Sequence, residues 1–350
     1  MEFGVQFFPD VKPEEKSGAE YFRDALALVE GADALGFTHI RIVEHYFHYY
    51  GGYSPNPMLF LAAAAERSQR ARLVTGAVLP VFNHPLKLAG EIGMLDAISQ
   101  GRLDVGFARA FLPHEFRRFG RSPDESVARF REGVEQVDLL LRAENVTYHG
   151  RFHDIVNTTS LPRPTQKPRP KFYVAALNTP ESFAFAGEKG YSVMAIPLSG
   201  GRMGPLIETY HKARAAAGYE SKGEVMLAFH MYCAEDGEEA RTYASPLLDR
   251  YLHSLVDSAA DWLDGRTSQD YPGYDRIIAK LKQSNAAEQI ATGAAWIGSP
   301  AEIAAQIVRC REEFGEFEHA SLQVNFNTMP LEPAQRSLRL FARSVMPHFT

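Results

Sequence analysis

Arg72-Leu73-Val74-Thr75-Gly76-Ala77-Val78-Leu79 is a short apolar run that indicates a buried strand. A helical pattern follows from Pro85, with Leu88, Ile92, Leu95 and Ile98 on one face. A strand followed by an amphipathic helix is one βα unit of a parallel sheet. The same order of strand and helix recurs on both sides of this unit, so the unit represents the whole chain.

The alternation of strand and helix continues in both directions from this unit. Further strands are predicted over residues 3–8, 38–43, 103–107, 171–175, 192–196, 225–231 and 320–324. Together with residues 72–79 they can close a (β/α)₈ TIM barrel, and 350 residues fit one such domain. The prolines of residues 161–170 predict an extended joint between the barrel halves. The sequence therefore predicts an α/β fold with a single barrel domain over residues 1–350.

The longest gap between predicted strands lies before the last strand. Residues 232–296 are more than one crossover helix needs, and such an excess often marks an insertion or lid over an active site. The regular pattern returns at Ser299, which has N-cap character, followed by Pro300 at the first helical position and Glu302 to complete a capping box. We therefore expect an insertion at about 232–296 and a helix from Pro300.

The composition favours a globular protein that binds a small molecule. Hydrophobic residues make up 45% and charged residues 23% of the chain, and the net charge of −6 comes without a basic cluster. These features argue against nucleic-acid binding and against a membrane span. The N-terminal residues carry no secretion signal, so we expect a cytoplasmic protein. Cys233 and Cys310 are not in metal-ligand spacing, and we expect buried thiols and no metal site.

Polar residues at strand ends are the first candidates for chemistry, because a barrel of this type places its active site there. Glu44-His45 follows the second predicted strand, and an imidazole beside a carboxylate suits general acid–base catalysis. A buried structural histidine is the alternative.

Arg109 follows the fourth strand after the small residues Gly106 and Ala108. Its guanidinium suits a phosphate, although a salt bridge on the barrel rim would also explain it.

The segment Asn178-Thr179-Pro180-Glu181-Ser182 follows the fifth strand and begins a helix, with Thr179 as N-cap. Free N–H groups at a helix start attract anions, so a phosphate is a candidate ligand here, with simple capping as the alternative.

Thr75 and Gly76 lack bulk, which suits a flat ring on the third strand or tight packing. The chain contains no Gly-x-Gly-x-x-Gly, Walker or His-Glu-x-x-His motif, which argues against Rossmann, P-loop and zinc-protease sites.

Several of these positions match motifs of one known family. Residues 101–109, Gly-Arg-Leu-Asp-Val-Gly-Phe-Ala-Arg, resemble a segment of the bacterial luciferase α subunit in spacing and residue type. Glu44-His45-Tyr46-Phe47 is similar to that family's Glu-His-His-Phe, and Ile297-Gly298-Ser299-Pro300 and residues 344–347 are also similar. As a set, these motifs span nearly the whole chain. The chain therefore resembles the bacterial luciferase-like flavin-dependent monooxygenases.

The resemblance implies a TIM barrel, reduced FMN (FMNH₂) as cofactor and a homodimer. It also implies that a flavin hydroperoxide oxygenates a small, apolar organic substrate. The chain lacks a nicotinamide-binding motif, which favours a separate NAD(P)H:flavin reductase as partner. By position, His45 would be the catalytic acid or base, and Arg109 would bind the FMN phosphate. The other implied cofactor-binding residues are Glu44, Thr75, Gly76, Ala108, Asn178, Thr179, Ser182 and Met194, with a non-prolyl cis peptide at Thr75-Gly76.

Two positions depart from luciferase itself. Ala108 stands where luciferase α subunits have a reactive cysteine, and Tyr46 replaces the second histidine of the pair. We therefore expect oxygenation of another organic substrate and no light emission. Two alternatives stay open: a deazaflavin-dependent hydride-transfer enzyme of the same superfamily, and a non-catalytic flavin-binding barrel.

Overall fold

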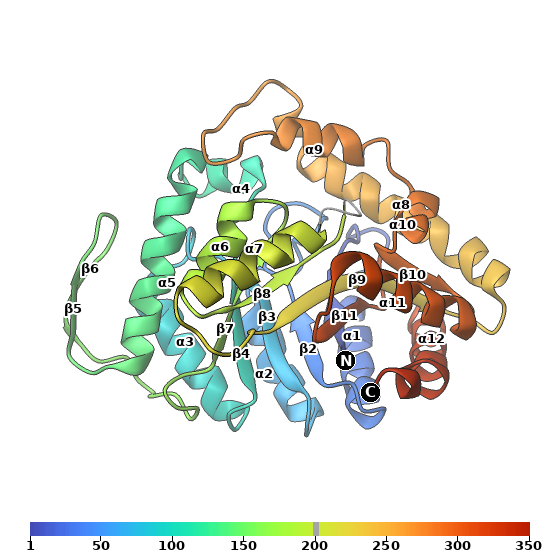
Figure 1. Ribbon diagram of the computed structural model, residues 1–350, viewed down its shortest axis with the longest axis horizontal. Helices are drawn as coiled ribbons and strands as arrows, with labels where there is room; N and C mark the ends of the chain where they lie inside the picture. Colours follow the sequence, from blue (N-terminus) through green and yellow to red (C-terminus); the bar gives the residue numbers. More distant parts are fainter. Residues whose placement is uncertain (199–202) are drawn as a thin grey trace.

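A closed ring of parallel strands forms the centre of the computed structural model, which describes residues 1–198 and 203–350 (Figure 1). The strands pair in the order β11-β1-β2-β3-β4-β7-β8-β9, and β9 also pairs with β11, which closes the ring. The predicted (β/α)₈ TIM barrel is confirmed. Its strands are β1 (Glu2–Phe7), β2 (His39–Ile42), β3 (Arg72–Val78), β4 (Leu103–Phe107), β7 (Lys171–Ala176), β8 (Ser192–Ala195), β9 (Val225–Cys233) and β11 (His319–Gln323).

Helices cover the outside of this ring. Ser17 and Ser299 each form a capping box with the glutamate three residues later, at the starts of α1 and α11, as predicted for Ser299. The helices are α1 (Gly18–Ala34), α2 (Pro57–Arg67), α3 (Pro85–Ile98), α4 (Pro113–Arg118), α5 (Ser126–Arg142), α6 (Pro180–Glu188), α7 (Met203–Ala216), α8 (Gly237–Ser258), α9 (Tyr274–Leu281), α10 (Ala286–Ala291), α11 (Pro300–Phe314) and α12 (Leu331–Ser344), with 3₁₀ turns η1 (Pro123–Glu125), η2 (Ala260–Trp262) and η3 (Met346–His348).

Side chains from alternate strand positions fill the inside of the barrel. Val74, Tyr173, Met194 and Met226 form a cluster there, and each is at most 1% exposed. On the outside, the apolar faces of the helices pack against the strands, and both cysteines are buried free thiols, as expected. The packed interior leaves the carboxyl end of the barrel as the place where strands and loops can enclose a cavity.

A break in the ladder between β3 and β4 shapes that end of the barrel. The strands pair at Thr75 with Val105 and, after a register shift, at Val78 with Phe107. Within the break, the Thr75 hydroxyl donates to the Gly106 carbonyl and accepts from the Gly106 N–H, both at 2.9 Å. These bonds satisfy two buried backbone groups that the shift removes from the ladder. The peptide bond at the break, Gly76–Ala77, is cis, one residue beyond the expected position.

The structure differs from the sequence-based predictions at several further places. An additional strand, β10 (Ala295–Gly298), pairs with the end of β9, and a hairpin of β5 (Val146–His149) and β6 (Asp154–Thr158) lies outside α5 (Figure 1). The segment after β4 contains the short helix α4. Ile98, predicted on the inner face of its helix, is 37% exposed because it lies in the last turn.

The expected insertion before the last barrel strand is present. It contains α8, η2, α9, α10 and β10, and Figure 1 shows α8 and α9 crossing above the barrel toward α4. No helix within residues 1–198 and 203–350 is both long enough and apolar enough to cross a membrane.

Candidate active site

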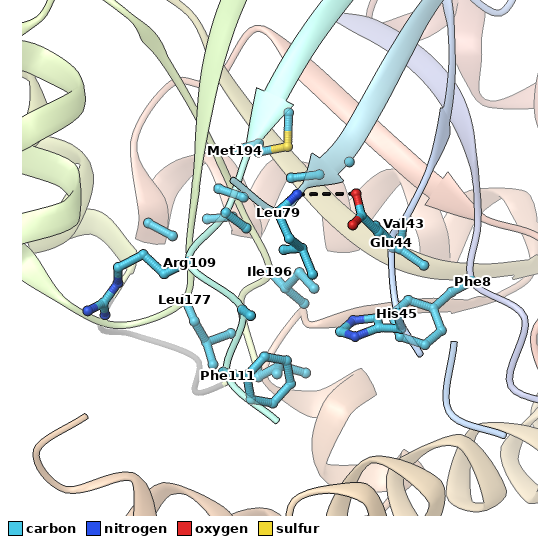
Figure 2. A pocket seen from close by; sticks show the side chains of 18 of the residues that line it. Phe8, Val43, Glu44, His45, Leu79, Arg109, Phe111, Leu177, Met194 and Ile196 are labelled. Atoms are coloured by element: carbon cyan, nitrogen blue, oxygen red, sulfur yellow. Dashed lines mark hydrogen bonds between the residues drawn. The ribbon is translucent and has the colours of Figure 1, made fainter. Parts of the chain in front are cut away.

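A cavity of about 1080 Å³, counting its open mouth, lies at the carboxyl end of the barrel (Figure 2). We call it the main cavity. Most of its wall is apolar, as is usual for sites that bind small molecules. The strands and the loops that follow them contribute Phe8, Val43, Glu44, His45, Gly76, Ala77, Leu79, Ala108, Arg109, Phe111, Leu177, Thr179, Ser182, Met194 and Ile196.

Most of the candidate site residues predicted from the sequence lie around the main cavity. Glu44, His45, Gly76, Ala108, Arg109, Thr179, Ser182 and Met194 line it. Two residues predicted to bind the cofactor do not line the cavity. Thr75 is fully buried and bonds to Gly106 in the neighbouring strand, and Asn178 lies between the lining residues Leu177 and Thr179 without lining the cavity itself. In this structure Thr75 acts on the shape of the sheet and Asn178 lies beside the cavity wall.

His45 is held in place by a carboxylate that the sequence did not reveal. Its Nδ1 lies 3.1 Å from Oε1 of Glu115, a residue of α4 whose side chain is completely buried, and the same oxygen accepts from the Tyr46 N–H at 2.8 Å. Because this oxygen already accepts from a backbone N–H, it also serves as an acceptor for the ring, and an imidazole proton on Nδ1 completes the pair and leaves Nε2 available. Figure 2 shows the His45 ring pointing into the cavity. This arrangement suits a group that takes up or releases a proton.

Glu44 is a buried carboxyl group on the cavity wall. Its oxygens accept from the Leu79 N–H at 3.2 Å, from Asn83 Nδ2 at 2.9 Å and from the Tyr46 hydroxyl. Burial raises the pKa of Glu44 to about 7, and the three donors keep it from rising further. Glu44 can therefore change its protonation state near neutral pH inside the cavity.

Arg109 lies on the opposite side of the cavity from His45 (Figure 2). Its Nη1 donates to the Asp270 carbonyl at 3.1 Å, and its guanidinium lies 5.0 Å from the centre of the Tyr271 ring. It makes no ion pair within the described residues, so the alternative of a rim salt bridge lacks a partner there. Arg109, Thr179 and Ser182 line both the main cavity and a second cavity beside it.

The start of α6 borders the same two cavities as Arg109. Thr179 occupies the N-cap position, but its hydroxyl makes no capping bond, so capping does not account for this side chain. A helix start offers N–H groups and a partial positive charge, and the guanidinium adds a full one. Together, Arg109, Thr179 and Ser182 could hold an anionic group such as a phosphate at this end of the cavity.

The insertion supplies the outer wall of the cavity. Leu255 of α8 and Tyr274, Ile278 and Leu281 of α9 line it. The insertion is tied to the loop after β4, because Trp262 Nε1 donates to the Phe111 carbonyl at 2.9 Å and the Tyr271 hydroxyl donates to the Ala110 carbonyl at 2.8 Å. The side chains of Leu255, Ile278 and Leu281 make this side of the cavity apolar.

The arrangement fits a flat ring with an anionic tail better than a metal ion. Gly76, Ala77, Ala108, Ala175 and Ala176 leave the cavity wall without bulk. A Cβ on Gly106 would lie 2.3 Å from the Thr75 carbonyl oxygen and 2.5 Å from Met194 Cε, so this glycine is required. Over residues 1–198 and 203–350, no group of three or more His, Cys, Asp or Glu residues could hold a metal ion.

In both sequence and structure, the chain is similar to luciferase-like monooxygenases. A family model described as luciferase-like monooxygenase matches residues 1–316. The oxygenase component of a flavin-dependent trigonelline monooxygenase from Acinetobacter baylyi is 32% identical over 251 residues, which are 71% of this chain and 69% of that protein. The crystal structure of the monooxygenase RslO1 from Streptomyces bottropensis superimposes with a TM-score of 0.89 at 45% identity and covers 100% of both chains.

Two further likenesses bear on the ligand. The oxygenating constituent of 3,6-diketocamphane monooxygenase from Pseudomonas putida, in complex with FMN, has the same fold, with a TM-score of 0.82 at 22% identity over 100% of this chain and 99% of that one. F420-dependent glucose-6-phosphate dehydrogenases also match, over 50% of this chain. FMN is thus named for the first of these proteins and F420 for the others.

The raised pKa of Glu44 predicts a specific dependence of stability on pH. The folded protein keeps a proton that the unfolded chain, with the ordinary carboxyl pKa of 4.5, has already released. The contribution of Glu44 to stability is therefore present below pH 4.5 and is lost as the pH rises through 7. We expect the unfolding free energy of the wild type to fall by about 3 kcal/mol relative to Glu44→Gln over this range.

Urea unfolding of both proteins at several pH values between 5 and 8 measures this difference. The buried Asp10, whose pKa burial raises to about 8, is common to both proteins and cancels in the comparison. A difference that stays constant with pH would mean that the three donors keep Glu44 ionised throughout.

Proposed function

The chain belongs to the luciferase-like monooxygenase family, and we propose that it uses reduced FMN and O₂ to oxygenate a small, apolar organic substrate. One observation carries this proposal. The anion-binding end formed by Arg109 and the start of α6 lies across an apolar cavity from the His45–Glu115 pair (Figure 2). A cofactor with a phosphate tail and a flat ring would place its ring between these two ends.

Reduced FMN, when bound, supplies the two electrons with which one oxygen atom of O₂ enters the substrate and the other becomes water. The residues that would hold it are Arg109, Thr179 and Ser182 at the phosphate, and Gly76, Ala77, Ala108 and Met194 along the ring. FMN in the related camphane monooxygenase and the flavin dependence in the name of the trigonelline enzyme support this choice over F420.

The chain's own residues would provide proton transfer and a dry environment. His45 would take up or release a proton at Nε2, and Glu115 would act as a positioning residue that fixes the ring through Nδ1. The side chains of the insertion would exclude water from the reacting groups. Since the wall near His45 is formed by Phe8, Tyr50 and Phe111, the substrate would be apolar.

The reduced cofactor would come from a separate NAD(P)H:flavin reductase. The relative from Acinetobacter is named as the oxygenase component of its enzyme, which supports a division into two components.

We also propose a homodimer, based on an apolar surface on two neighbouring helices. Leu59 of α2 is 73% exposed and Met94 of α3 is 58% exposed, and the other exposed large apolar residues of α3 are Leu86 and Ile98. Exposed apolar surface of this kind is typical of a protein interface.

The oligomeric state is checked by light scattering after size-exclusion chromatography. We expect a mass of twice 39.0 kDa for the wild type and a shift toward the monomer for the double variant Leu59→Glu/Met94→Glu. Val308→Glu, which places the same charge on an exposed apolar residue of α11, is the matched control and should stay dimeric. A monomeric wild type would contradict the proposal.

Removal of Arg109 should weaken the binding of FMN but hardly that of riboflavin, which has the same ring and no phosphate. The expected loss for FMN in Arg109→Ala is about 10- to 100-fold, the value of a charge-assisted contact. Titration of each ligand by fluorescence or calorimetry measures both affinities. An equal loss for the two ligands would show that Arg109 acts on the ring or on the fold, and not on a phosphate.

Removal of His45 should lower oxygenation strongly. Purified protein would be incubated with FMN, a flavin reductase, NADH and ¹⁸O₂ together with a panel of apolar alkenes and ketones, and products that gain one labelled oxygen atom would be detected by mass spectrometry. We expect His45→Ala to reduce product formation by about 10²- to 10⁴-fold. His48→Ala is the control, because His48 lies in the same loop and does not line the cavity.

Glu115→Gln should lower the rate less than His45→Ala and shift its pH profile, because this variant changes the group that fixes the imidazole proton. Two results would contradict the proposed activity. One is the absence of labelled product from the wild type with every substrate, and the other is a clear preference for F420 over FMN. Unchanged product formation in His45→Ala would remove His45 from the reaction.

A further inference from the structure

Arg41 is a buried cation without a counter-charge. Its side chain, on β2, is 4% exposed and points into the barrel. Its Nη1 donates to Gln6 Oε1 at 2.6 Å and its Nη2 donates to the Gly76 carbonyl at 3.0 Å, while Nε has no partner. Both acceptors are neutral, and within the described residues no carboxylate forms an ion pair with Arg41.

Another buried arginine differs from Arg41 in its hydrogen bonds and its position. Arg214 is 8% exposed and also makes no ion pair within the described residues, but each of its three nitrogens donates to Ser221 or Tyr191, and it does not line the main cavity. Arg41, by contrast, lines the main cavity together with its two hydrogen-bond partners, Gln6 and Gly76. Its guanidinium therefore lies at a place that can receive a ligand.

Gly76 makes this position possible. A Cβ on Gly76 would lie 2.0 Å from Arg41 Nε and 2.4 Å from Arg41 Cγ, so any larger residue would displace the guanidinium. Gly76 also lines the cavity and belongs to the break in the β3–β4 ladder. The local backbone is thus shaped around the arginine side chain.

A ligand bound in the cavity can supply the charge that balances Arg41. Moving a cation out of water costs several kcal/mol unless an opposite charge compensates it. Burial lowers the pKa of Arg41 to about 10, which still leaves it protonated at neutral pH. A negative charge bound beside Arg41 would therefore be stabilised strongly, and the same ligand in a neutral state would not.

We propose that Arg41 supplies the counter-charge for the negative charge of the two-electron-reduced flavin ring, so that this chain binds reduced FMN more tightly than oxidised FMN. The inference rests on the proposed use of FMN. The oxidised ring is neutral and the reduced ring is an anion near neutral pH, and a charge beside the ring nitrogens is a means by which a protein tunes a flavin. Such a preference would let the chain capture reduced FMN from a reductase and release it once oxidised.

Equilibrium binding in the absence of O₂ tests this role without any turnover. Dissociation constants would be measured for oxidised FMN and for FMN reduced with dithionite, using the wild type, Arg41→Met and Arg41→Lys. We expect the wild type to prefer the reduced form, Arg41→Met to lose about tenfold or more of that preference, and Arg41→Lys to keep most of it because the charge is retained. Each tenfold loss lowers the two-electron potential of bound FMN by about 30 mV.

Arg109→Ala is the matched control in this experiment. The phosphate is the same in both redox states, so this variant should weaken both forms equally and leave their ratio unchanged. A ratio that is the same in Arg41→Met and the wild type overturns the role of Arg41 while leaving FMN use intact. Binding of neither form by the wild type would overturn the proposed function instead.

The wild type also provides a measurement that does not depend on whether the variants fold. If bound FMN has a potential equal to or below that of free FMN, the wild type does not prefer the reduced form, and the inference is wrong. Retained binding of oxidised FMN by Arg41→Met would show that its site is folded.

Discussion

Parallel pairing of the barrel strands into a closed ring is the constraint on which the other features of the molecule depend. Because all strands run in one direction, their carboxyl ends meet at one edge, and the loops after β2, β3, β4, β7 and β8 converge there. Residues more than a hundred positions apart in the chain, such as Glu44 and Ser182, therefore line one cavity. The ladder break at Thr75 and Gly106 adds a local departure from this regularity at the point where Gly76 and Arg41 meet.

Charged groups in this apolar cavity are arranged in distinct ways. Glu44 has three hydrogen-bond donors, Glu115 has the His45 ring and a backbone N–H, and Arg109 has a carbonyl and an aromatic ring. Arg41 has two neutral acceptors and an unpaired nitrogen. Since an unbalanced charge is costly in a buried place, these differences indicate where a ligand contributes its own charge.

The family relationship identifies a luciferase-like monooxygenase but not its substrate. Relatives include monooxygenases as well as enzymes named as F420-dependent dehydrogenases, so similar sequences serve more than one reaction. The outer part of the cavity wall comes from the insertion, where Tyr274, Ile278 and Leu281 close the space above the strands.

The sequence by itself determined the barrel, and it also predicted part of the candidate site. Strand and helix periodicity is local, so the order of elements, the capping box at Ser299 and the insertion could be predicted, and motif positions at strand ends nominated His45, Arg109, Thr179 and Ser182. Only the tertiary structure brought Glu115 to His45 and α9 over the cavity, because those contacts join segments distant in sequence. It also placed Thr75 in the sheet and left Arg41 without a counter-charge, since the partners of a buried group depend on which strands become neighbours.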